Sequence, residues 1–130
     1  MSDVQTQFEH LCQQWQELTR AEARAIQAGN WAAVEQCQLA KTQLQPKLMA
    51  ATDALRQAAA QQGRARQTEQ HIQQLVGHLL SLERQNEAAL AAQYDRVRQQ
   101  QADLAQAAQT LRQLRRAYGG SAPATWQRWS

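Results

Sequence analysis

The sequence has few of the residues that build strands, turns or membrane spans. Its 130 residues include four Val, two Ile, two Tyr, four Trp and one Phe, with five Gly and two Pro. So few β-branched, aromatic and turn-forming residues disfavour an all-β or a β-α-β fold. No run approaches the roughly 20 apolar residues of a membrane span. The opening MSDVQTQFEH lacks the cationic and apolar segments of a secretory signal, so we expect a cytoplasmic protein.

Motifs for catalysis or metal binding are also missing. The chain contains no C-x-x-C, P-loop, G-x-G-x-x-G or G-x-S-x-G sequence. His71 and His78 are seven residues apart, whereas zinc-binding pairs on helices usually have a spacing of four. Cys12 and Cys37 would be offset by about 15 Å in a hairpin that turns at Gly29-Asn30, too far for a disulfide. We therefore predict no enzyme activity, no metal, no cofactor and two free thiols.

What the sequence has in abundance favours helices. Gln occurs 26 times and Ala 25 times. In the first 28 residues one heptad series is accompanied by Phe8 and Trp15 at the intermediate positions, which predicts an amphipathic helix. This series consists of Val4, Leu11, Leu18 and Ala25. Gly29-Asn30 is expected to end this helix and to cap the next one.

A second helix is predicted from Trp31 to about residue 60, where the sequence fades into Ala and Gln. Its two heptad series are Val34, Lys41, Leu48 and Leu55, and Cys37, Leu44, Ala51 and Ala58. Pro46 lies inside this block and predicts a kink or a short break. Trp15 and Trp31 are expected to pack in the core.

The third helix is predicted over about residues 67–118, and its second half carries the clearest heptad of the chain. The series is Leu90, Val97, Leu104, Leu111 and Tyr118, with companions Tyr94, Gln101, Ala108 and Arg115. Glu83 and Glu87 fall in the extrapolated seam, which predicts a shift of phase there. Gly77 is a candidate position for a bend. Gly119-Gly120 and Pro123 predict the end of the helix.

These elements predict an all-α fold in which an antiparallel hairpin packs on a long C-terminal helix, as a three-helix bundle or coiled-coil-like unit. We expect one domain over 1–120 and a short flexible tail over 121–130 that carries Trp126 and Trp129. The hairpin is too short to cover the whole third helix, and an uncovered apolar stripe needs a partner. The predicted partner-binding residues are Leu90, Tyr94, Val97, Leu104, Leu111 and Tyr118, with Arg112, Arg115 and Arg116 as a basic rim.

Four segments together resemble a known family. They are Q-W-Q-E-L at 14–18, A-I-Q-A-G-N-W-A-A-V-E-Q at 25–36, L-L-S-L-E-R-Q-N-E-A-A-L at 79–90 and L-R-R-A-Y-G-G at 114–120. This combination is similar to the flagellar type III export chaperones of the FliT and FlgN kind, in which a Trp begins the second helix and a Tyr-Gly closes the last. The short tail after Gly120 departs from the FliT type, which has an additional helix there.

The resemblance implies a chaperone that covers an amphipathic, otherwise disordered C-terminal segment of an export substrate. The substrates it implies are the filament-cap protein or the hook–filament junction proteins, with components of the export apparatus as further partners. Two other interpretations stay open. A coiled-coil structural or adaptor subunit would form a homodimer without any client. A nucleic-acid-binding protein would use the basic C-terminal third, but the chain lacks a recognisable binding fold.

Overall fold

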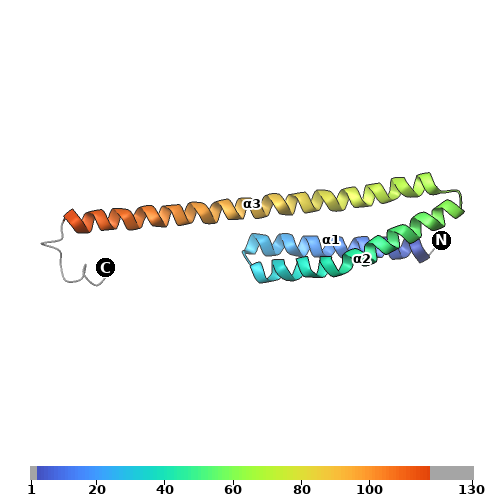
Figure 1. Cartoon of the computed structure of the whole chain (residues 1–130), viewed down its shortest axis with the longest axis horizontal. Helices are drawn as coiled ribbons and strands as arrows, with labels where there is room; N and C mark the ends of the chain where they lie inside the picture. The colour runs from blue at the N-terminus through green and yellow to red at the C-terminus, as the bar shows by residue number, and fades with distance from the viewer. Residues whose placement is uncertain (1–2, 118–130) are drawn as a thin grey trace. The chain divides into compact units, whose positions relative to one another are not determined.

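The computed structural model describes residues 3–117, which form three α-helices and no strand. Helix α1 spans Asp3–Ala28, α2 spans Trp31–Gln61 and α3 spans Ala65–Ala117 (Figure 1). The predicted all-α fold is therefore confirmed. The chain divides after Gln93 into a first unit, 1–93, and a second unit, 94–130, of which residues 94–117 are described.

Two glycines in the left-handed region end the first two helices. Gly29 has φ of 68° and Gly63 has φ of 71°, a conformation that other residues adopt at a cost. Asn30 then caps α2, because its side-chain oxygen accepts a hydrogen bond of 3.2 Å from the Ala33 backbone N–H. The predicted turn at Gly29-Asn30 and its capping role are confirmed.

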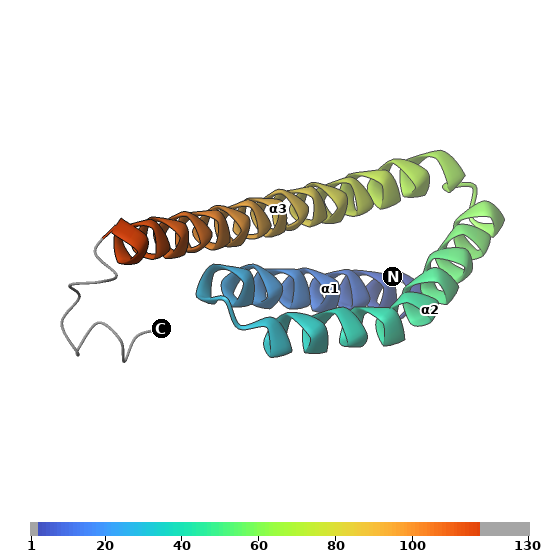
Figure 2. The ribbon, with the colours of Figure 1, turned by 60° about the vertical axis from the view of Figure 1, so that its left-hand side comes forward.

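In the first unit, α1 and α2 form an antiparallel hairpin against which the first part of α3 packs (Figure 2). The larger apolar cluster joins the start of α1, the second half of α2 and the start of α3. Its buried members are Phe8, Leu11, Cys12, Leu44, Ala51, Leu55, Ile72 and Leu79. Since residues near the start of α1 meet residues near the start of α3, these two helices run parallel.

A smaller apolar cluster lies at the other end of the first unit. It contains Ala25, Ile26 and Val34, with Ala89 and Leu90 of α3 packed against it. It thus joins the end of α1, the start of α2 and a later stretch of α3. Together the two clusters place the hydrophobic core where the heptad series of the hairpin predict it.

The expectation of a kink or a short break at Pro46 is met in part. Helix α2 is continuous through Pro46, and its axis changes direction in the middle of the helix (Figure 2). Helix α3 continues through Gly77. A Cβ at this position would meet no atom within 4 Å, so there is space for a side chain. Trp31 is exposed rather than in the core, because it precedes Val34, the first buried residue of α2.

Other sequence expectations on the first unit are met. Trp15 packs against the larger cluster. Cys12 is buried, Cys37 is half-buried and both are free thiols. Among the described helices, none is long and apolar enough to cross a membrane.

Candidate functional site

Between the two apolar clusters of the first unit, each helix contributes charged or polar side chains to the interior. These are Glu22 and Thr19 from α1, Lys41 from α2, and Glu83 and Asn86 from α3. We call these five residues the polar layer. Glu22, Lys41, Thr19 and Asn86 are buried, and Glu83 is half-buried.

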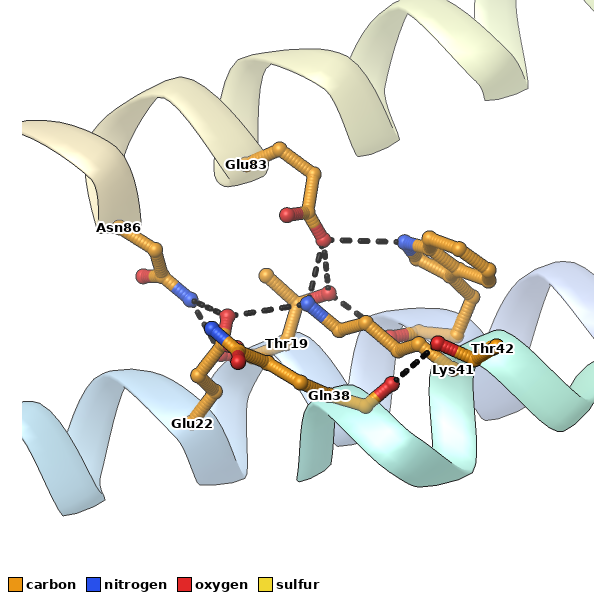
Figure 3. Close-up of polar contacts among 8 residues, drawn as sticks. Thr19, Glu22, Gln38, Lys41, Thr42, Glu83 and Asn86 are labelled. Atoms are coloured by element: carbon orange, nitrogen blue, oxygen red, sulfur yellow. Dashed lines mark hydrogen bonds and ion pairs between the residues drawn. The ribbon is translucent and has the colours of Figure 1, made fainter. Parts of the chain in front are cut away.

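Lys41 is the centre of the polar layer. Its Nζ donates to Glu22 Oε1 at 3.0 Å and also to Glu83 Oε1 (Figure 3). The ammonium group therefore links a carboxylate on α1 to a carboxylate on α3. It also lies 5.7 Å from the centre of the Trp15 ring, within the range of a cation–π interaction.

Neighbouring polar groups form further hydrogen bonds with the Glu22 and Glu83 carboxylates. Asn86 Nδ2 donates to Glu22 Oε1 and to the Thr19 carbonyl oxygen, both at 2.9 Å. Glu83 Oε1 also accepts from Trp15 Nε1 at 3.1 Å and lies 3.0 Å from Thr19 Oγ1. Within residues 3–117 no buried side-chain nitrogen or oxygen lacks a hydrogen-bond partner.

This arrangement favours one alignment of the three helices. Sliding or rotating α3 on the hairpin would leave buried charges unpaired, which costs several kcal/mol. A polar residue in an otherwise apolar seam is the best-attested device for fixing helix register. The layer therefore fixes the register of the first part of α3 against the hairpin. No group of three or more His, Cys, Asp or Glu side chains in 3–117 is placed to hold a metal ion.

The polar layer was not predicted from the heptad pattern, although its charges occupy heptad positions. Glu22 continues the seven-residue spacing of Phe8 and Trp15. Lys41 follows Val34 by seven residues. Glu83 lies seven residues after Val76 and seven before Leu90. Each helix thus has one charge in its seam, which is negative on α1 and α3 and positive on α2. The predicted phase shift near Glu83 is wrong, because Val76, Glu83 and Leu90 all face the hairpin. Glu87, by contrast, is exposed.

The second unit offers a different kind of surface. In 94–117 no described residue is buried, and only Ala108 is half-buried. The large apolar side chains are 63% exposed at Tyr94, 71% at Leu104 and 57% at Leu111, and Val97 and Leu114 are each 42% exposed. These five residues lie on one side of the helix by their spacing, and we call them the exposed stripe.

The predicted partner-binding residues are therefore divided. Leu90 belongs to the first unit, where it packs against the smaller apolar cluster. Tyr94, Val97, Leu104 and Leu111 share the exposed stripe, to which the structure adds Leu114, a residue that the sequence analysis did not select. Arg112, Arg115 and Arg116 are exposed. Tyr118, Trp126 and Trp129 lie outside the described residues.

An apolar stripe of this kind has a clear energetic meaning. Burying an exposed Leu side chain is favourable by roughly 1.5–3 kcal/mol, and this gain opposes the entropy that a partner loses on binding. A helix of this length without tertiary contacts is only marginally stable in water. The stripe is thus the part of the described chain best suited to bind a second apolar helix.

Comparison with protein-family models, with curated proteins and with solved structures finds no match to this chain. The resemblance to the flagellar export chaperones rests on the sequence segments that carry it.

Proposed function

We propose that this chain is a cytoplasmic export chaperone that keeps an amphipathic, otherwise disordered segment of a flagellar or other type III substrate soluble. The single observation that carries the proposal is the exposed stripe. Tyr94, Leu104 and Leu111 are each more than half exposed, and they repeat at helical spacing over several turns. An amphipathic helix can cover such a stripe with its own residues at i, i+3, i+4 and i+7.

The first unit supports the same proposal in a different way. Its core and its polar layer hold the hairpin and the first part of α3 together without using the exposed stripe. Folding of the first unit and binding to the stripe therefore depend on different residues. A chaperone needs this separation, because it must stay folded before the client binds and after the client leaves.

The client loses conformational entropy when it becomes ordered on the stripe, which reduces the net affinity. Moderate affinity suits a chaperone that must release its substrate at an export gate. The clients that we propose are the C-terminal segments of filament-cap or hook–filament junction proteins, as the family resemblance implies.

The proposal is tested by capture of these segments with matched variants. Leu104→Asp/Leu111→Asp places two charges in the stripe, and Gln106→Asp/Gln113→Asp places the same charges at the same spacing on the opposite side of the helix. All four residues are exposed, so both variants should fold. We expect the wild type and the Gln variant to retain the client segment, and the Leu variant to lose it. Equal capture by the two variants would contradict the proposal.

The alternative function is a coiled-coil structural or adaptor subunit. It is favoured by the continuation of the heptad from Val97 through Leu104 to Leu111. Light scattering after size-exclusion chromatography separates the two functions. A tight homodimer without a client, which Leu104→Asp/Leu111→Asp converts to a monomer, would favour the structural subunit.

A further inference from the structure

The exposed stripe has two edges that differ in charge. At about 100° per residue, Arg98, Arg112 and Arg116 lie along one edge, which we call the arginine edge. Arg98 and Arg112 are two heptads apart, and Arg116 follows one turn later. The opposite edge carries Arg96 and Asp103, whose charges cancel.

Among the described residues, the guanidinium groups of the arginine edge have no ion-pair partner. All three side chains are exposed, and within residues 3–117 no carboxylate forms an ion pair with any of them. Asp103, on the other edge, accepts a hydrogen bond of 3.1 Å from Gln99 Nε2. The arginine edge is therefore a line of unneutralised positive charge beside apolar side chains.

The end of the helix explains only part of this charge. Arg115 and Arg116 occupy the last turn of α3, where cations interact favourably with the helix dipole. Arg98 lies about five turns earlier, beyond the reach of that effect. Arg112 and Arg116 are also like charges at i, i+4, which is mildly unfavourable in a free helix. A bound partner with negative charges would remove this repulsion.

We propose that the occupant of the exposed stripe is an acidic amphipathic helix whose carboxylates face Arg98, Arg112 and Arg116. This rests on the proposed function and specifies the chemistry of the client. The stripe from Tyr94 to Leu114 is about 30 Å long, so the client helix has about three heptads. Its carboxylates are densest opposite Arg112 and Arg116. Arginine suits this role because its planar guanidinium group binds a carboxylate with two parallel hydrogen bonds.

Other occupants fit this surface less well. A second copy of 94–117 would bring five arginines and only two acids, and so would add repulsion instead of neutralising the edge. A nucleic-acid backbone would neutralise the arginines but would leave Leu104 and Leu111 uncovered. An acidic amphipathic helix satisfies the charges and the apolar side chains together.

The test uses the full chain and synthetic peptides of about three heptads that share one Leu stripe and differ at one edge, which carries either Glu or Lys. Binding is measured by fluorescence anisotropy at low and high salt. We expect the Glu peptide to bind roughly tenfold more tightly than the Lys peptide at low salt, with a smaller difference at high salt. Leu104→Asp should abolish the binding of both peptides.

Charge reversal provides the matched control. Arg98→Glu/Arg112→Glu should reverse the preference between the two peptides, whereas Arg96→Glu on the opposite edge should preserve it. Circular dichroism checks that every variant keeps its helices.

The remaining outcomes overturn the inference in distinguishable ways. If both peptides bind equally and Leu104→Asp abolishes both, the acidic client is excluded while the proposed function stands. If neither peptide binds, both fail. Binding of a single-stranded oligonucleotide that Leu104→Asp leaves unchanged would replace the client with a nucleic acid. A homodimer that Leu104→Asp dissociates would replace it with a second copy.

Discussion

At the scale of single residues, Lys41 connects all three helices of the first unit. It joins Glu22 of α1 to Glu83 of α3 and contacts the Trp15 ring. The Lys41 and Glu22 side chains are only 7% and 5% exposed, so water cannot replace a lost partner. The contribution of Lys41 to stability is therefore best seen when it is removed.

Replacing Lys41 with Ala is predicted to lower the free energy of unfolding by about 3–5 kcal/mol. The reason is that the Glu22 carboxylate stays buried without its counter-charge. Lys47→Ala, an exposed position on the same helix, should change stability by less than about 0.5 kcal/mol. Urea unfolding followed by circular dichroism measures both variants.

The double variant Lys41→Met/Glu22→Met should be more stable than Lys41→Ala, because it removes the buried charges together. A loss for Lys41→Ala as small as that for Lys47→Ala would contradict the role of the polar layer.

Cys12 has a chemical signature that follows from its place in the core. Burial raises the pKa of its thiol to about 11 from the usual 9.0, and the Glu9 carboxylate adds to the effect. Below pH 9 the thiol is therefore protonated and enclosed, and the thiolate is the reactive form. We predict that iodoacetamide modifies the half-buried Cys37 well before Cys12 in the folded protein, as peptide mass spectrometry would measure.

The same shift in pKa predicts how stability depends on pH. The folded state keeps the Cys12 proton between pH 9 and 11, where the unfolded chain loses it, so stability falls as the pH rises through this window. A Cys12→Ala variant should lack this part of the pH dependence, and urea unfolding across the window measures it. Modification of both cysteines at equal rates, or an unchanged pH slope in Cys12→Ala, would contradict the burial of Cys12.

At the scale of helices, the sequence predicted the number, order and antiparallel pairing of the elements, because heptad spacing and the Gly29-Asn30 turn are local signals. It did not predict the polar layer, because each charge has a meaning only when the other two helices are present. Glu83 was interpreted as a break in the seam, whereas Lys41 makes it part of the seam. Trp31 was misplaced for a similar reason, since aromatic character alone does not determine which side of a helix is covered.

The glycines give a matched prediction for the helices and their ends. Gly77 lies inside α3 with open space around it, so Gly77→Ala should stabilise the protein by about 0.5–1 kcal/mol. Gly29→Ala should destabilise it by about 1–2 kcal/mol, because φ of 68° is unfavourable for an L-residue with a Cβ. Thermal unfolding of the two variants measures the opposite signs. A loss of stability in Gly77→Ala would contradict the open surroundings of Gly77.

At the scale of the whole molecule, stability and binding are assigned to different stretches of the sequence. Every described residue that is buried lies at or before Asn86, whereas the exposed stripe and the arginine edge lie in 94–117. Substitutions in the first unit should therefore change stability, and substitutions in the stripe should change binding. This separation allows the proposed function to be tested without unfolding the protein.

Hydrogen exchange should report this separation directly. Amides of α3 between Ile72 and Leu90 are predicted to exchange slowly, through opening of the first unit, because their side chains pack in its two apolar clusters. Amides in 94–117 should exchange much faster, because a helix without tertiary contacts opens readily. Mass spectrometry of peptic fragments measures both rates in one sample.

When a saturating client peptide is added, exchange in 94–117 should slow while exchange between Ile72 and Leu90 stays the same. Equal protection of the two stretches in the free protein would mean that the stripe already has a partner, and the client would then have no surface to bind.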